Sequence, residues 1–159
     1  MNTQDFTIQE EQLPLILSLL DESQLFPIQP QGCSMFPFFM GNRDTLYIKK
    51  PVFPLKRGDI ALYRRKNGTY VVHRVHHTKE AAPSGHSLQY YMLGDHQTWI
   101  EGPIEEDQIY GYVTAYERKG KKIDCASNRK YNLLWRVWMR LRIARPFFCS
   151  IWNFIHKHS

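Results

Sequence analysis

Between residues 45 and 117 the chain contains five short segments rich in β-branched and aromatic residues, each bounded by Gly, Pro, Asn or Asp. Such segments favour strands, because branched and aromatic side chains pack well on a pleated surface. The expected strands are Thr45 to Lys49, Asp59 to Arg64, Thr69 to His76, Leu88 to Leu93 and Ile109 to Glu117. Asn67-Gly68 predicts a type I′ hairpin turn between the second and the third, because both residues tolerate positive φ. This run of strands predicts a mainly β fold.

The two ends of the chain differ from this central region. Residues 8 to about 26 predict a helix, because leucine and isoleucine cluster there before Pro27 and Pro30 end it. Residues 80 to 87 are rich in Ala, Ser, Gly and Pro and predict a surface loop between strands. We therefore expect an N-terminal helical extension over residues 1–29, a central domain over residues 30–124 and a C-terminal helical tail over residues 125–159.

The C-terminal tail is both basic and aromatic. From Cys125 to Ser159 it contains no Asp or Glu. Its alternating basic and aromatic residues include Arg129, Lys130, Trp135, Arg136, Trp138, Arg140, Arg142, Arg145, Phe147, Phe148, Trp152 and Lys157. One interpretation is peripheral attachment to an anionic membrane, with tryptophans in the interfacial zone and arginines on lipid headgroups. A helix packed on the central domain, with arginine stems covering apolar surface, fits the pattern equally well.

Charge and hydropathy limit the partners and the compartment. A formal net charge of +6 and a pI near 9.3 favour an acidic partner, either nucleic acid or an anionic membrane face. The apolar stretches at residues 13–20 and 146–155 are shorter than the ~20 residues that a spanning helix requires. The N-terminus lacks the basic start and apolar run of a secretory signal. We expect a cytoplasmic protein, with peripheral contact at the inner membrane face as a possible addition.

Two residues point to chemistry. Ser34 lies between Gly32 and Pro37, where a hydroxyl is exposed enough to attack a substrate and the serine N–H can face an oxyanion. Strand alternation divides the surrounding residues of the third strand into one face with Val71, His73 and Val75 and another with Tyr70, Val72 and Arg74. An imidazole flanked by valines is partly desolvated, which favours its neutral, basic form. Taken singly, the serine has a simpler interpretation as a turn residue and His73 as a core or edge histidine bonded to a backbone carbonyl.

Acidic residues follow the fourth expected strand. Asp95 comes directly after Leu93-Gly94, at a strand end, where functional side chains often lie. An Asx-turn is its simpler interpretation. Glu101, six residues later, is a second acid that can reach the same region. Together with Ser34 and His73, these carboxylates indicate nucleophilic catalysis.

The residue pattern resembles the signal peptidase I and LexA-like serine peptidases. The nucleophile motif of that family is a Ser-Met-x-Pro segment, which corresponds here to Ser34-Met35-Phe36-Pro37. The similarity continues through Asn42-Arg43-Asp44-Thr45-Leu46, Arg57-Gly58-Asp59-Ile60, Val72-His73-Arg74-Val75, Leu93-Gly94-Asp95 and Ile109-Tyr110-Gly111-Tyr112-Val113. It covers roughly residues 30 to 117, and the ordered set is more specific than any one element. The family implies a small β-barrel-type catalytic domain, here with helices at both ends.

The resemblance also implies roles for individual residues. His73 stands where the bacterial enzymes have a lysine and where the archaeal and endoplasmic-reticulum branch has a histidine. On that basis Ser34 is the expected nucleophile and His73 the general base, while Asp95 orients the imidazole or Glu101 replaces or assists it. The residues next to the nucleophile, Met35, Phe36 and Pro37, are expected to line pockets for small or apolar substrate side chains. Two features depart from the family: no spanning helix is expected in this sequence, where relatives normally have an anchor, and His96-Gln97 stands where asparagines are common.

The expected function is therefore a serine endopeptidase that cleaves a signal- or leader-type peptide or preprotein. The alternative is a catalytically inactive peptidase-fold module whose basic surface binds membrane or nucleic acid. Nucleic acid is not the expected partner of the enzyme, because too few residues precede Cys33 for a helix-turn-helix domain. No cofactor is expected. No metal is expected at His73, His76 and His77, since positions three apart on a strand face opposite sides unless a bulge intervenes, and Cys33, Cys125 and Cys149 lack zinc-site spacing.

Overall fold

The structure is a computed structural model that describes residues 24–81 and 88–147. The described residues form eight strands, one α-helix and two short 3₁₀ helices. The strands are β1 (Phe26–Ile28), β2 (Asp44–Lys49), β3 (Ile60–Arg64), β4 (Tyr70–Glu80), β5 (Leu88–Leu93), β6 (Glu101–Ile104), β7 (Ile109–Arg118) and β8 (Lys121–Asp124). The helices are η1 (Glu106–Gln108), α2 (Arg129–Arg140) and η2 (Arg142–Ala144). The prediction of a mainly β fold is confirmed.

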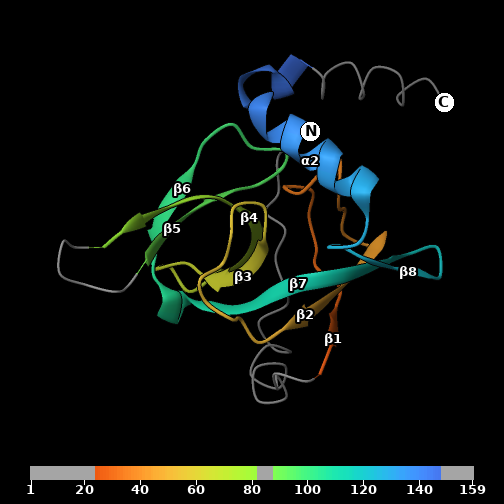
Figure 1. Ribbon diagram of the computed structural model, residues 1–159, viewed down its shortest axis with the longest axis horizontal. Helices are drawn as coiled ribbons and strands as arrows, with labels where there is room; N and C mark the ends of the chain where they lie inside the picture. Colours follow the sequence, from red (N-terminus) through yellow and green to blue (C-terminus); the bar gives the residue numbers. More distant parts are fainter. Residues whose placement is uncertain (1–23, 82–87, 148–159) are drawn as a thin grey trace.

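All eight strands belong to one open antiparallel sheet (Figure 1). Seven of them follow the order β1-β2-β7-β3-β4-β5-β6, and β8 pairs with β7 beside this path. Strand β7 pairs with three strands, because β2 lies along one of its edges while β3 and β8 pair with the other edge in succession. Helix α2 lies across one end of the sheet. Within the described residues, no helix is long and apolar enough to cross a membrane.

The five strands expected from the sequence are all present, and three more join them. The additional strands β1, β6 and β8 are short and contain residues that strands usually avoid: Pro27, Gly102-Pro103 and Lys121-Lys122. Strands β1 and β6 lie at the two ends of the sheet order, where one row of backbone groups needs no ladder partner. The expected N-terminal helix lies mostly outside the described residues, and Phe26 at its end belongs to β1. The expected loop at 80–87 is also largely outside them.

Two hairpin turns differ from the sequence expectation. Asn67-Gly68 does connect β3 to β4, but only Gly68 has a positive φ, of 92°. The turn is closed by the Gly68 N–H donating to the Arg65 carbonyl at 2.9 Å, so it is wider than a two-residue type I′ turn. Positive φ at two consecutive residues occurs instead at Lys119-Gly120, between β7 and β8, with φ of 52° and 72°. A lysine precedes the glycine there, so the Asn-Gly signal was missing from the sequence.

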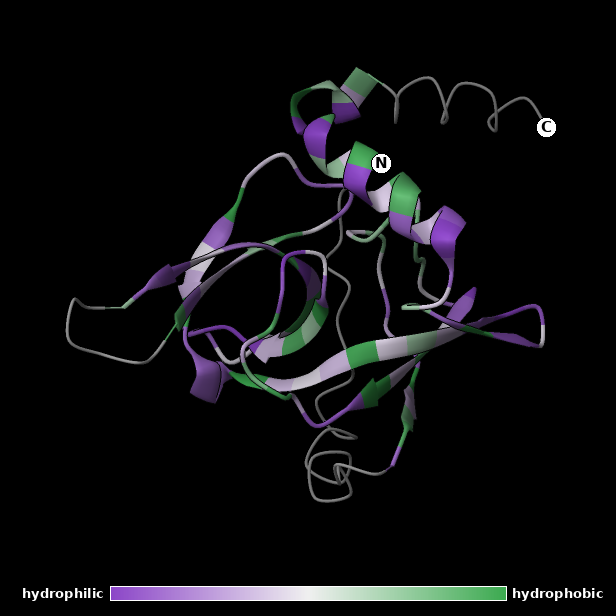
Figure 2. Cartoon of the chain, in the orientation of Figure 1, coloured by the Kyte–Doolittle hydropathy of each residue, from purple (hydrophilic) through white to green (hydrophobic). Residues whose placement is uncertain are grey.

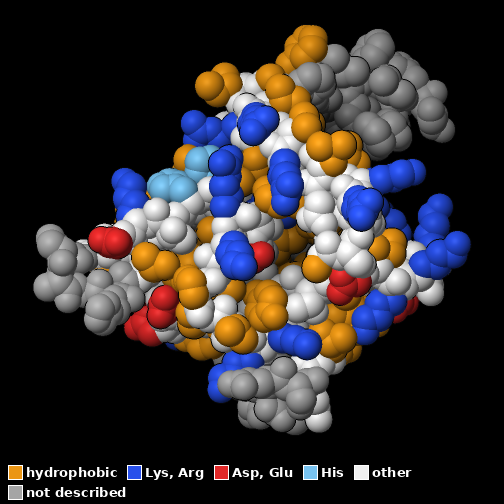
Figure 3. Space-filling model, viewed as in Figure 1, with side chains coloured by type: hydrophobic (Ala, Val, Ile, Leu, Met, Phe, Trp, Pro, Cys, Tyr) orange, Lys and Arg blue, Asp and Glu red, His pale blue; other side chains and the backbone are white. Residues whose placement is uncertain are grey.

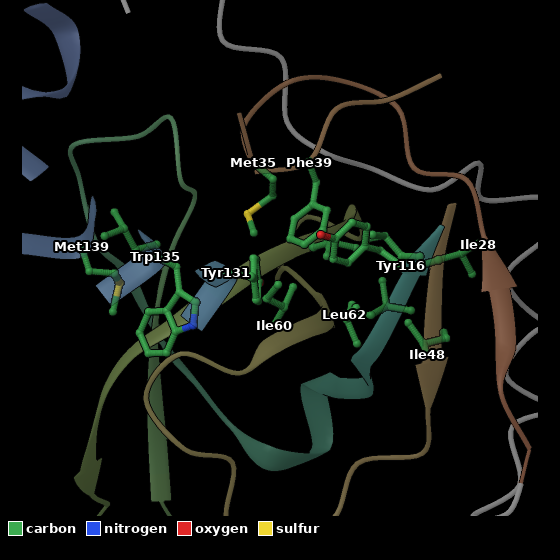
Figure 4. Packing of buried hydrophobic residues seen from close by; sticks show 14 residues of the cluster. Ile28, Met35, Phe39, Ile48, Ile60, Leu62, Tyr116, Tyr131, Trp135 and Met139 are labelled. Carbon is green, nitrogen blue, oxygen red and sulfur yellow. The ribbon is translucent and has the colours of Figure 1, made fainter. Parts of the chain in front are cut away.

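Buried side chains on the sheet pack against α2 in one hydrophobic cluster (Figure 4). The helix contributes Tyr131, Trp135 and Met139, which recur at a spacing of four residues and so share one helix face. Asn128 caps the start of α2, since its side chain accepts a hydrogen bond from the Tyr131 N–H. Hydrophobic and hydrophilic residues alternate along the strands and along α2 (Figure 2). The C-terminal helix therefore completes the core of the sheet.

Candidate active site

Ser34 lies in a series of turns that precedes β2. The Phe36 N–H donates to the Cys33 carbonyl at 2.9 Å, and the Phe39 N–H donates to the Met35 carbonyl at 2.8 Å. The side chains of Met35 and Phe39 are completely buried in the main hydrophobic cluster. These two anchors hold the segment against the sheet, so the position of Ser34 is determined by core packing as well as by turns.

Asp44 holds the far end of this segment. Its carboxylate accepts hydrogen bonds from the Met40 N–H at 3.0 Å and from the guanidinium groups of Arg43 and Arg118. Both arginines also donate to the carbonyl of Phe38. Burial acts to raise the pKa of Asp44, but the hydrogen bonds from Arg118 and Arg43 outweigh it and lower the pKa below its usual value. The charged carboxylate therefore ties the segment that contains Ser34 to the start of β2 and the end of β7.

Ser34 and His73 are in direct contact. Their hydroxyl Oγ and imidazole Nε2 are 2.9 Å apart, and both side chains are completely buried. The alternation expected along β4 holds, because His73 faces this contact while the next residue, Arg74, bonds to a different set of groups. A serine oxygen at hydrogen-bond distance from a histidine nitrogen is the arrangement that nucleophilic catalysis by a serine requires.

The other imidazole nitrogen of His73 contacts Tyr63 on the adjacent strand β3. The Tyr63 hydroxyl lies 3.0 Å from His73 Nδ1. In the strand register, Ala61 lies opposite His73 and Tyr63 opposite Val71, so Tyr63 is the diagonal neighbour of His73. The small side chain of Ala61 leaves room beside the imidazole, and the long tyrosine reaches across it.

Glu101 lies close to both Tyr63 and His73. Its carboxylate Oε2 lies 3.8 Å from His73 Nδ1, and Arg65 binds both carboxylate oxygens at 2.6 Å. Burial, followed by the charge of Glu101, raises the pKa of Tyr63 far above its usual value. The phenol therefore stays protonated and can accept a hydrogen bond from His73 while it donates its own. Of the two acids considered from the sequence, Glu101 lies next to His73.

Asp95 lies in a different environment. Arg74 binds its two carboxylate oxygens at 3.0 and 2.7 Å, and both side chains are completely buried. Arg74 also donates to the carbonyl of Gly58 and to the hydroxyl of Tyr131. Burial acts to lower the pKa of Arg74, but the charge of Asp95 outweighs it and raises the pKa. Asp95 thus neutralises a buried arginine, and its carboxylate is directed to Arg74 and not to the imidazole of His73.

The turn that contains Asp95 nevertheless supports Ser34 through the backbone. The His96 N–H donates to the Ser34 carbonyl at 2.8 Å. A Cβ atom at Gly94 would lie 2.8 Å from the same carbonyl oxygen, so the close approach requires glycine. The buried guanidinium of Arg145, from the C-terminal segment, donates to the carbonyls of Gly94 and Gln97. The C-terminal segment therefore helps to position the turn behind Ser34.

The residues expected to line substrate pockets occupy three environments. Met35 is buried in the main core, and Phe36 is buried in a small cluster with Cys33 and Met40. Pro37 is half-buried and lines a surface hollow of about 470 Å³. The hollow also involves Phe38, Tyr116, Leu134, Val137 and Trp138, so it lies between the segment that contains Ser34 and α2.

The three histidines of β4 do not gather into one site. A bulge between Val75 and His77 in the β4–β5 pairing brings His76 and His77 together, with their Nδ1 atoms 2.8 Å apart. His73 contacts Ser34 and Tyr63 instead. Within residues 24–81 and 88–147, no three or more His, Cys, Asp or Glu residues are grouped so that they could hold a metal ion.

Comparisons of the chain with protein-family models, with curated proteins and with solved structures yield no match. The geometry of the described residues is therefore the basis for inferring the function.

Sequence reasoning did not single out Tyr63, Arg65 or Arg145. The signal for Tyr63 was available, because the Asn67-Gly68 hairpin pairs the two strands and strand alternation places Tyr63 and His73 on the same face. Arg65 and Arg145 carried no such signal, since their partners Glu101 and the 94–97 turn are distant in sequence.

Proposed function

We propose that the protein is a serine endopeptidase in which Ser34 is the nucleophile and His73 is the general base. The observation that carries this proposal is the 2.9 Å distance between Ser34 Oγ and His73 Nε2. The curved antiparallel sheet is compatible with the β-barrel-type domain of the signal peptidase I and LexA-like family (Figure 1). We propose this finer fold assignment together with the activity.

In the proposed reaction, His73 Nε2 accepts the proton of the Ser34 hydroxyl as Oγ attacks the carbonyl carbon of the scissile peptide bond. The resulting imidazolium then donates that proton to the leaving amine, so that an acyl ester with Ser34 and a free amino terminus are formed. His73 then deprotonates a water molecule that attacks the ester carbonyl, and it returns this proton to Ser34 Oγ as the carboxylic acid product leaves. The backbone N–H of Ser34 is our candidate for binding the oxyanion, as expected from the sequence.

Tyr63 and Glu101 act as positioning residues for His73 in this proposal. If Nδ1 carries the proton and donates to the Tyr63 hydroxyl, then Nε2 is free to act as the base. The Tyr63 hydroxyl in turn donates to Glu101, which Arg65 holds in place. The negative charge of Glu101, 3.8 Å from Nδ1, stabilises the imidazolium that forms during catalysis. Glu101 thereby takes the assisting role that the sequence left open between two acids.

The proposed substrate is an extended signal- or leader-type peptide. Because Ser34 and His73 are completely buried, a substrate has to displace the groups that cover them. The specificity for small or apolar side chains, and the location of the enzyme at the cytoplasmic side, are carried over from the sequence as proposals.

The test is peptide cleavage by the full chain. Ser34→Ala and His73→Ala should each abolish cleavage of a leader-type peptide library, whereas the matched variants Ser127→Ala and His77→Ala should retain it. A fluorophosphonate probe should label Ser34, as located by peptide mass spectrometry. Cleavage should increase with pH as the imidazole of His73 loses its proton. Cleavage that survives both catalytic substitutions contradicts the proposal, and salt-sensitive binding that is unaffected by Ser34→Ala, without cleavage, favours the inactive binding module.

A further inference from the structure

Helix α2 is apolar on both sides. Its inner side buries Tyr131, Trp135 and Met139 in the core. Its outer side exposes Leu133, Leu134, Val137 and Leu141, whose exposed fractions are 65, 59, 46 and 37%. Leu133, Val137 and Leu141 recur every four residues, so together with Leu134 they form one stripe, called here the outer aliphatic stripe.

A helix that covers a core normally carries polar residues on its outer side. The outer side of α2 carries the outer aliphatic stripe instead, and two more apolar residues, Ile143 and Phe147, are 85 and 65% exposed after the helix. In the space-filling view, hydrophobic side chains gather over α2 among Lys and Arg side chains (Figure 3). An exposed apolar patch of this kind marks a binding surface.

Arginines flank the stripe along one side. Arg129, Arg136 and Arg140 are exposed, and they project about 60 to 100° around the helix from Val137. Arg136, Arg140 and Arg57 line a hollow of about 250 Å³ with Trp135. From Cys125 to the end of the chain there is no acidic residue to offset them.

We infer that this face of α2 docks on the surface of an anionic lipid bilayer. The bilayer buries the aliphatic side chains at the level of the acyl chains while its phosphates bind the arginines. A second copy of the chain fits less well, because it would bring the arginines of two helices together. Nucleic acid would bind the arginines but leave the aliphatic side chains exposed.

The arginines of this face were expected from the sequence to bind headgroups, but the apolar residues differ from the expected tryptophans. Trp135 is buried, and Trp138 is half-buried with its indole N–H donating to the Asp95 carbonyl. Arg145 is buried and bonds to the 94–97 turn. Trp135, Trp138 and Arg145 are therefore used inside the protein, and leucine and valine supply the lipid contact.

Bilayer docking follows from the surface of α2 alone and does not require the proposed peptidase activity. If that activity exists, the two features are adjacent, because Leu134 and Val137 line the same hollow as Pro37 and Phe38. A substrate held at the bilayer surface would then be close to the nucleophile segment.

The test is co-flotation of the full chain with vesicles of phosphatidylcholine alone or with added phosphatidylglycerol. We expect binding to the anionic vesicles and little binding to the neutral ones. The variant Leu133→Ser/Val137→Ser should weaken binding by about 30-fold or more, because two buried aliphatic side chains are lost. The variant Arg136→Gln/Arg140→Gln should weaken it by about 10- to 30-fold and reduce its salt dependence.

Matched controls lie away from α2. Val52→Ser removes a side chain that is also 65% exposed, and Lys66→Gln removes a surface charge in the β3–β4 turn; neither should change binding. All substituted residues in the stripe are exposed, so circular dichroism should show an intact fold. Absence of binding to anionic vesicles, or binding that Leu133→Ser/Val137→Ser leaves unchanged, would overturn the inference. Light scattering that reveals a dimer dissociated by the same substitutions would assign the stripe to a second copy instead.

Discussion

Arg74 and Asp95 form a buried ion pair with two hydrogen bonds, of 3.0 and 2.7 Å, beside the proposed catalytic pair. His73 and Arg74 are consecutive in β4, and the alternation of the strand directs them to opposite faces of the sheet. The ring planes of Phe38, Tyr131 and Trp135 also lie near the Arg74 guanidinium. The Arg74–Asp95 pair therefore connects β4, the 94–97 turn and α2. The proposed catalytic residue His73 lies on the opposite face of β4.

Asp95→Asn should lower the stability of the fold and leave the chemistry of Ser34 and His73 largely unchanged. The substitution leaves the charge of Arg74 buried without its counter-ion, which costs about 3–5 kcal/mol of unfolding free energy. Urea denaturation measures this loss. Among molecules that remain folded, the pH dependence of cleavage should match that of the wild type. A shifted pH profile with normal stability would instead assign Asp95 to His73.

Removing the Tyr63 hydroxyl should impair catalysis. In Tyr63→Phe, His73 Nδ1 loses its partner at 3.0 Å, so the imidazole is no longer held in the tautomer that leaves Nε2 basic. We expect kcat to fall about 10- to 100-fold, equivalent to about 1.4–2.8 kcal/mol, with a smaller change in KM.

Glu101→Gln should lower kcat in the same way and should shift the acidic limb of the pH profile, because the charge beside the imidazole is removed. For Tyr63→Phe, the matched control is Tyr91→Phe, since Tyr91 stacks on His77 away from Ser34. Wild-type kcat in Tyr63→Phe and Glu101→Gln would exclude the positioning role of both residues.

Acidification should destabilise the fold through His76. Burial, and then the positive charges of His77, Arg57 and Arg142, lower the pKa of His76 to about 4 from its usual value of 6.5. Because the pKa in the folded state is lower than in the unfolded state, the stabilisation is present above pH 6.5 and is lost as the pH falls towards 4. The ring is partly exposed, so solvent screening limits the loss to roughly 1–2 kcal/mol.

The measurement is the free energy of unfolding in urea at pH 7.5 and pH 5. The wild type should lose more stability between these two values than His76→Gln, which cannot titrate there. An equal loss in both proteins would show that His76 does not contribute.

Two glycines with positive φ should respond differently to alanine. At Gly58, with a φ of 102°, a Cβ atom would lie 2.2 Å from Cη2 of the buried Trp135. At Gly68, with a φ of 92°, the nearest atom would be 3.6 Å away at the end of the Arg64 side chain. Gly58→Ala should therefore cost about 3 kcal/mol or more, from backbone strain and overpacking together. Gly68→Ala should cost about 1–2 kcal/mol from strain alone. Similar midpoints of thermal unfolding for the two variants would contradict the contact between Gly58 and Trp135.

Local sequence patterns were sufficient to predict much of the fold. The alternation around His73 predicted its separation from Arg74, and the β-rich segments predicted the five longer strands. The short strands β1, β6 and β8 could not be predicted, since their stability comes from pairing with β2, β5 and β7 and not from their own composition. The hairpin at Asn67-Gly68 was predicted, but its turn type depended on the register of β3 and β4.

By itself, the sequence determined the mainly β class and the basic, acid-free character of the C-terminal segment. It also led to the hypothesis that a serine motif approaches a histidine on a strand. These properties depend on residue type and short-range spacing. Only the tertiary structure decided that Glu101, through Tyr63, lies at His73 while Asp95 is paired with Arg74, and that α2 turns leucine and valine outward while it buries Trp135. The reason is that strand pairing, bulges and helix rotation bring together groups separated by tens of residues, and no local periodicity encodes which of several similar side chains will meet.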